Sequence, residues 1–113
     1  MGESKSSRTS SSLREWSRDL RRELPPLLPI EVRRARMRPK DHGDCDVLRR
    51  ADGSPYKFRV RINARLDAEA ALHVLAHEWA HALSWSSDSD RIEEHSAEWG
   101  LAMARVWNVL GGE

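Results

Sequence analysis

The stretch "AHEWAHALSW", residues 76–85, determines how the rest of this 113-residue chain is interpreted. His77 and His81 lie four residues apart, which is about one helical turn, so both imidazoles leave the same face of a helix. Two imidazole nitrogens at that separation can bind one tetrahedral zinc ion. Glu78 is offset by about 100° from His77 around the helix, within reach of a water molecule at the metal. We therefore predict a zinc site at which Glu78 accepts and donates protons.

The flanking residues place this motif in the middle of a long helix. Asp67 is a typical N-cap residue, and Glu69 follows in the first turn. The helix is expected to run to about Trp85, with apolar surface from Leu72, Leu75, Trp79 and Leu83. After the break at "SSDSD", the spacing of Asp90 and Glu93 predicts the start of a last helix. The apolar face of that helix repeats at Trp99, Met103, Val106 and Leu110.

The region before the motif has the alternation of a β-sheet. In "PYKFRVRIN", residues 55–63, an apolar face of Tyr56, Phe58, Val60 and Ile62 alternates with Lys57, Arg59 and Arg61. Two shorter strands are expected from Ile30 and over residues 45–49, and a helix over residues 13–23. We predict an α+β fold in which a small three-stranded, mainly antiparallel sheet packs with an N-terminal, a central and a C-terminal helix. Residues 1–12 are expected to form a disordered Ser-rich tail, and residues 13–113 a single domain.

Composition limits the class of protein. The charged fraction is 33%, and no apolar run approaches the roughly 20 residues of a membrane span, so we expect no membrane association. Cys45 is the single cysteine, which excludes an internal disulfide or a Cys-x-x-Cys zinc ribbon in this sequence and favours a cytoplasmic location.

Charge is divided unevenly between the two halves of the sequence. Residues 1–66 contain 17 Lys and Arg against 9 Asp and Glu (+8), whereas residues 67–113 contain 2 against 9 (−7). A basic N-terminal half can be a solvated surface or can contact nucleic acid phosphates. The residues that would make such contacts include Arg33, Arg34, Arg36, Arg38 and the basic face of residues 57–61.

A zinc hydrolase also needs a third protein ligand and an open fourth position. Ser84 stands where the extended metzincin motif has glycine, which excludes that class. The candidates for the third ligand are Glu94, His95 and Glu98, in "EEHSAEWG" at the start of the last helix.

Two segments together resemble the SprT-like zinc metallopeptidases, particularly the short phage and prophage forms. These are "HEWAHALSW" (residues 77–85) and "EHSAEWGLAMARVW" (residues 94–107), in which His95 precedes Trp99 by four residues. The likeness covers roughly residues 55–108 and implies a minimal zincin-like architecture. It implies zinc ligands His77, His81 and His95 with Glu78 as general base. Glu98 then serves as an acceptor that orients an imidazole, and Glu98 and Glu94 remain alternative ligands.

The sequence thus predicts a zinc-dependent endopeptidase acting on protein or peptide substrates. The alternative is a nucleic-acid-associated accessory protein whose zinc site is structural or vestigial. Smaller questions concern His73, which shares the face of His77, and a possible second metal cluster at His42, Asp44, Cys45 and Asp46. Alternation assigns Tyr56 to the core, although a tyrosine on this strand could also assist an oxyanion.

Overall fold

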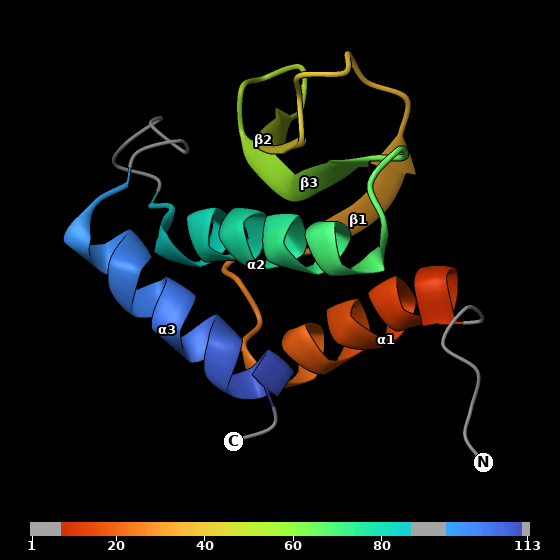
Figure 1. The fold of residues 1–113 in the computed structure, drawn as a ribbon. Helices are drawn as coiled ribbons and strands as arrows, with labels where there is room; N and C mark the ends of the chain where they lie inside the picture. Colours follow the sequence, from red (N-terminus) through yellow and green to blue (C-terminus); the bar gives the residue numbers. More distant parts are fainter. Residues whose placement is uncertain (1–7, 87–94, 112–113) are drawn as a thin grey trace.

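The computed structural model describes residues 8–86 and 95–111, and it has three helices and three strands (Figure 1). The order along the chain is α1 (Arg8–Glu23), β1 (Ile30–Ala35), β2 (Gly43–Arg49), β3 (Pro55–Asn63), α2 (Ala68–Ser84) and α3 (Ala97–Gly111). This order confirms the predicted α+β class.

The sheet is mixed, which corrects the expectation of a mainly antiparallel one. Its strand order is β1-β3-β2, with β2 antiparallel and β1 parallel to β3. Strand β3 lies between the other two strands and pairs with both, so β1 and β2 form the two edges. The chain reverses direction between β1 and β2 and again between β2 and β3. Strands β1 and β3 therefore point the same way and pair in parallel.

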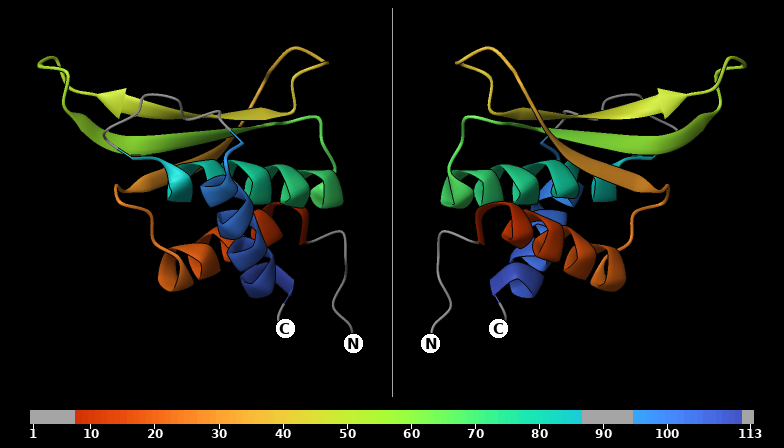
Figure 2. Two further views of the ribbon diagram at one scale, coloured as in Figure 1. Left: turned by 90° about the vertical axis from the view of Figure 1, so that its left-hand side faces the viewer. Right: turned by 90° about the vertical axis from the view of Figure 1, so that its right-hand side faces the viewer.

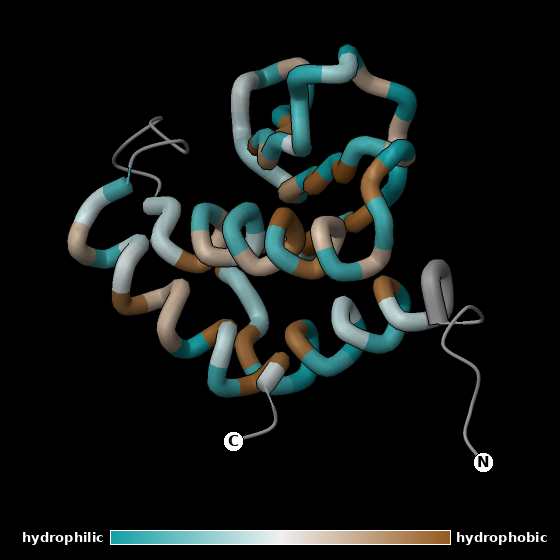
Figure 3. The backbone as a smooth tube through the Cα atoms, viewed as in Figure 1, coloured by the Kyte–Doolittle hydropathy of each residue, from teal (hydrophilic) through white to brown (hydrophobic). Residues whose placement is uncertain are grey.

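All three helices lie on one face of the sheet. Figure 2 shows the sheet as one layer, α2 directly beneath it, and α1 and α3 beyond α2. Helix α2 is the middle of the molecule and contributes the fully buried Leu75 and Trp79 to the core. The indole nitrogen of Trp79 donates a hydrogen bond to the carbonyl oxygen of Leu24 (3.0 Å), which fixes the end of α1 against α2. Figure 3 shows hydrophobic residues recurring between hydrophilic ones along α1, α2 and α3. No helix in the described ranges is long and apolar enough to cross a membrane.

Two helix starts differ from the prediction. Helix α1 begins at Arg8, so residues 8–12 are helical rather than part of a tail, while residues 1–7 lie outside the described residues. Helix α3 begins at Ala97, where the hydroxyl of Ser96 accepts a hydrogen bond from the backbone N–H of Trp99 (3.2 Å). The predicted start at Asp90 and Glu93 lies outside the described residues.

The expectation that Tyr56 lies in the core is wrong. Its side chain is 38% exposed, and the guanidinium of Arg50 lies 5.1 Å from the centre of its ring. The reason is the length of α2, which ends at Ser84. Trp85, directly after the helix, makes an edge-to-face contact with Phe58, so the helical layer covers β3 only about as far as Phe58.

The basic outer face of β3 is neutralised by the strands beside it. Lys57 pairs with Glu31 on β1 (2.8 Å), and Arg59 pairs with Asp46 on β2 (3.5 Å). The guanidinium of Arg61 binds the Asp44 carboxylate through two nitrogens. The sheet therefore presents an ion-pair ladder on the side opposite the helices.

Candidate metal centre

Helix α2 aims two of the predicted ligands at one point. Its start is fixed by Asp67, whose carboxylate accepts a hydrogen bond from the N–H of Ala70 (2.9 Å). The helix packs closely on strand β2. A Cβ added at Gly43 of β2 would lie only 2.6 Å from a methyl carbon of Val74 on the helix. His81 is fully buried and His77 is half-buried, so the site is closed on the side of the core.

The third histidine comes from the segment just before α3. His95 is exposed and precedes the capping residue Ser96, so it lies outside the helix rather than in its first turn. The ring of Trp99, in the first turn of α3, packs against all three imidazoles, with centroid separations of 5.1 Å to His77, 5.6 Å to His81 and 4.4 Å to His95. Its indole nitrogen also donates to the backbone carbonyl oxygen of His77 (3.4 Å). Trp99 thus joins α3 to α2, the helix that carries His77 and His81.

The three imidazoles converge through the same atom. The Nε2 atoms of His77, His81 and His95 are 3.2 Å apart in every pair. In a tetrahedral site with zinc–nitrogen distances of 2.0–2.1 Å, two ligand nitrogens are about 3.3–3.4 Å apart, so the triangle has the size that a metal ion requires. Three nitrogen lone pairs directed at one point repel each other unless a cation lies between them. These residues therefore fit a metal ion.

Electrostatics favours the form of His77 that binds metal. Burial, and secondarily the charge of His95, lower the pKa of His77 below its ordinary value. The neutral imidazole, which keeps a lone pair free for a metal, is therefore favoured at neutral pH. Because His95 is exposed, the triangle remains accessible to water on one side.

Glu78 is buried beside this triangle and lines a cavity of about 410 Å³. The cavity lies between α2 and the loop that joins β1 to β2, and its lining residues are Lys40, Asp41, His42, Gly43, His73, Val74, His77 and Glu78. A carboxylate next to one of the three converging histidines, at the wall of an open cavity, is placed to exchange protons with a bound molecule.

The loop wall of this cavity is held by Asn63, which the sequence analysis did not identify. Its side-chain amide nitrogen donates to the carbonyl oxygens of Arg38 (3.1 Å) and Asp41 (2.6 Å). Its backbone N–H donates to the carbonyl oxygen of His42 (2.8 Å). Asn63 is almost fully buried. The one available signal was a polar residue directly after the buried Ile62 at the end of a strand.

The remaining candidates have different positions. His73 lines the cavity and contacts the ring of Trp107 on α3 at 5.0 Å. Glu98 is exposed and, within the described ranges, makes no hydrogen bond to the three imidazoles, while Glu94 lies outside those ranges.

The possible second metal cluster around residues 42–46 does not assemble. Cys45 is buried in the core, whereas the carboxylates of Asp44 and Asp46 pair with arginines on the opposite face of the sheet. In the part of the chain that the structure describes, His77, His81 and His95 form the one group of histidine, cysteine and acidic residues that could hold a metal ion.

Comparison with known proteins gives one match. The model of the SprT-like family matches residues 11–112, which is almost the whole chain and extends well beyond the two segments that carried the resemblance. No curated protein and no solved structure matches the chain.

Proposed function

Because the chain belongs to the SprT-like family, whose members are metallopeptidase-like, we propose that it is a zinc-dependent endopeptidase. The observation that carries the proposal is the triangle of Nε2 atoms from His77, His81 and His95, 3.2 Å apart, next to the buried Glu78. Three neutral imidazoles leave the full +2 charge on the ion and one coordination position open, which are the properties of a catalytic rather than a structural zinc site.

Each residue then has a distinct task. Zinc, when bound, supplies Lewis acidity that polarises a carbonyl group and acidifies water. Glu78 takes the proton from the attacking water and passes it to the departing amine. The ring of Trp99 covers the imidazoles and keeps bulk water away from one side of them. The fully buried His81 and the half-buried His77 are held by the core, so their orientation does not depend on the substrate.

The cavity suggests how a peptide substrate enters. Strand β2 is an edge strand, and its first residue, Gly43, lines the cavity beside Glu78. An extended peptide can pair with the free backbone groups of such an edge, which would carry its carbonyl groups past the histidines.

The direct test combines metal analysis with cleavage. Purified protein is expected to contain about one zinc ion per chain and to cleave members of an unbiased peptide library. Chelation should abolish cleavage, and added zinc should restore it. Protein that takes up no zinc on reconstitution, or that holds zinc and cleaves no peptide or protein, would contradict the proposal.

The alternative function is a nucleic-acid-binding accessory protein with a structural metal site. The exposure of Arg33 and Arg36 favours it, although Arg59 and Arg61 are engaged by carboxylates. Binding of this kind weakens steeply with salt, and replacing Arg33 and Arg36 by glutamine should flatten the salt dependence while zinc content stays unchanged. Absence of DNA or RNA binding at low salt would exclude this alternative.

A further inference from the structure

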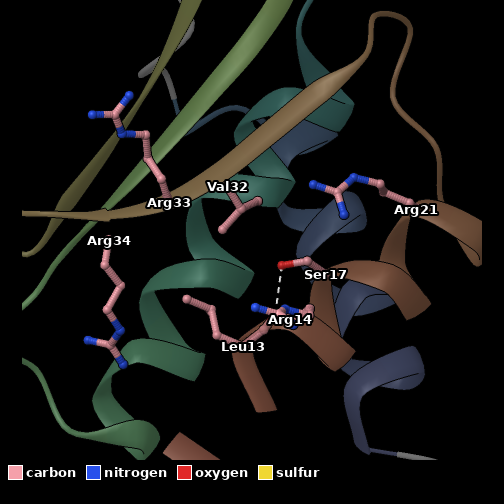
Figure 4. A pocket seen from close by; sticks show the side chains of 7 residues that line it. All are labelled: Leu13, Arg14, Ser17, Arg21, Val32, Arg33 and Arg34. Carbon is pink, nitrogen blue, oxygen red and sulfur yellow. Dashed lines mark hydrogen bonds between the residues drawn. The ribbon is translucent and has the colours of Figure 1, made fainter. Parts of the chain in front are cut away.

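A second cavity, of about 280 Å³, lies between helix α1 and strand β1 (Figure 4). The residues around it are Leu13, Arg14, Ser17 and Arg21 from α1 and Val32, Arg33 and Arg34 from β1. It shares no residue with the cavity beside Glu78. We call it the α1–β1 groove.

The α1–β1 groove is strongly basic. Four of its seven lining residues are arginines and none is acidic. Arg14 has no acidic partner among the described residues, and Arg33 has only a long contact with Glu31 (3.5 Å). Arg34 donates through Nη1 to the carbonyl oxygen of Leu66 (2.9 Å), while its Nη2 is buried without a hydrogen-bond partner in the described ranges. Guanidinium donors are therefore left for an anionic ligand.

The groove also contains the free edge of the sheet. At the two ends of β1, the carbonyl oxygens of Pro29 and Ala35 point toward β3. They accept hydrogen bonds from the backbone N–H groups of Phe58 and Ala64 (2.8 and 2.9 Å). Because parallel pairing alternates along a strand, the backbone groups of Ile30, Val32 and Arg34 point to the other edge. The guanidinium of Arg21 already donates two hydrogen bonds to the carbonyl oxygen of Ile30 (3.0 and 3.2 Å). The edge groups of Val32 and Arg34 have no strand partner in the described structure.

We propose that the α1–β1 groove binds an extended acidic segment of a partner protein. The segment would add to the β1 edge by backbone hydrogen bonds at Val32 and Arg34. It would place one carboxylate against Arg14 on the helix side of the sheet and another against Arg33 on the outer side, toward which Arg33 points in Figure 4. Leu13 and Val32 supply an apolar floor for the side chains between the carboxylates. This site is separate from the metal centre, so binding there does not depend on peptide hydrolysis.

A peptide satisfies more of the groove than a nucleic acid does. A nucleic acid backbone would use only the arginine charges, whereas an extended peptide also pairs with the strand edge. No aromatic residue lines the groove, so stacking platforms for unpaired bases are missing there.

The test uses the full chain carrying Glu78→Gln, so that the ligand is not cleaved. A labelled eight-residue peptide with the repeat Glu-Glu-Val-Val, which presents carboxylates on both faces of an extended strand, is titrated by fluorescence anisotropy at physiological salt. We expect it to bind, and we expect the Lys-Lys-Val-Val peptide of the same length not to bind. Arg14→Gln combined with Arg33→Gln should weaken binding about tenfold or more, because both charge-assisted hydrogen bonds are lost.

The matched control is Arg18→Gln combined with Arg36→Gln. These exposed arginines lie on α1 and just after β1 but do not line the groove, and the control removes the same net charge. It should weaken binding less than about twofold. The Glu-Glu-Val-Val peptide with N-methylated alternate amides, which cannot pair with a strand, should also bind about tenfold more weakly.

Three results would overturn the proposal. The first is that the two double variants weaken binding equally while both melt at the temperature of the parent protein. Binding would then depend on net charge alone and not on the groove arginines. The second is unchanged binding of the N-methylated peptide, which would remove the strand edge from the site. The third is a single-stranded oligonucleotide that binds through Arg14 and Arg33 while the acidic peptide does not, which would make the groove a nucleic acid site.

Discussion

Replacing Glu78 tests the catalytic step separately from metal binding. Glutamine preserves its shape but cannot accept a proton, so Glu78→Gln is expected to keep zinc content and melting temperature and to lose at least about 100-fold in kcat/KM. Asp41→Asn is the control, because Asp41 lines the same cavity but pairs with Arg38 (3.1 Å). Cleavage assays should show that this control keeps most of its activity. Comparable cleavage by Glu78→Gln and the parent would remove Glu78 from the role of base.

His95 and Glu98 provide a test of the third ligand. His95 completes the nitrogen triangle, whereas Glu98 is exposed and forms no hydrogen bond with the imidazoles in the described structure. Competition with a chromophoric chelator should show a loss of zinc affinity of several orders of magnitude for His95→Ala. Glu98→Gln should stay within about tenfold of the parent, which is the lower end of the range for residues that only orient a ligand. If Glu98 or Glu94 proves essential and His95 dispensable, the site belongs to the class with a glutamate ligand.

At the scale of elements, the contact between β2 and α2 sets the cavity. A Cβ added at Gly43 would lie 2.5 Å from the carbonyl oxygen of Arg61 and 2.6 Å from Val74. Gly43→Ala must therefore push β2 away from both β3 and α2, and we expect it to lower the free energy of unfolding by about 1–3 kcal/mol. Urea denaturation measures this change.

Gly100 offers the matched control for that substitution. It lies in α3, and no heavy atom lies within 4 Å of an added Cβ. Gly100→Ala should stabilise the protein by about 0.5–1 kcal/mol, because alanine has less backbone freedom to lose in a helix. A neutral Gly43→Ala variant would show that β2 and α2 can separate without cost.

At the scale of the whole molecule, a metal ion held by His77, His81 and His95 would join α2 to the segment before α3. An ion that binds only the folded state stabilises it by about 2.7 kcal/mol at a free concentration one hundred times its dissociation constant. A chelator should therefore lower the melting temperature of the parent protein in calorimetry. His81→Ala, which lacks one of the ligands, should melt at the same temperature with and without the chelator. A parent protein insensitive to chelation would contradict a metal that links the two helices.

The local features of this protein follow from the sequence alone. His77 and His81 share a helix face because their spacing equals one turn, and Asp67 begins that helix because its carboxylate can bind the free N–H of Ala70. The alternation of Phe58, Val60 and Ile62 likewise predicts a buried strand face, and all three are fully buried. Each of these depends on neighbours a few residues away, whose geometry the backbone fixes.

Only the tertiary structure decided the features that join distant segments. His95 meets His81 across 14 residues because α3 packs on α2 through Trp99, and the sequence left three candidates for that position. The parallel pairing of β1 depends on which strand takes the centre of the sheet, and the cavity wall depends on Asn63 reaching the loop at Asp41. Tyr56 is exposed because α2 ends before covering it. Such contacts are set by how far each element extends and what it meets, which local spacing does not encode.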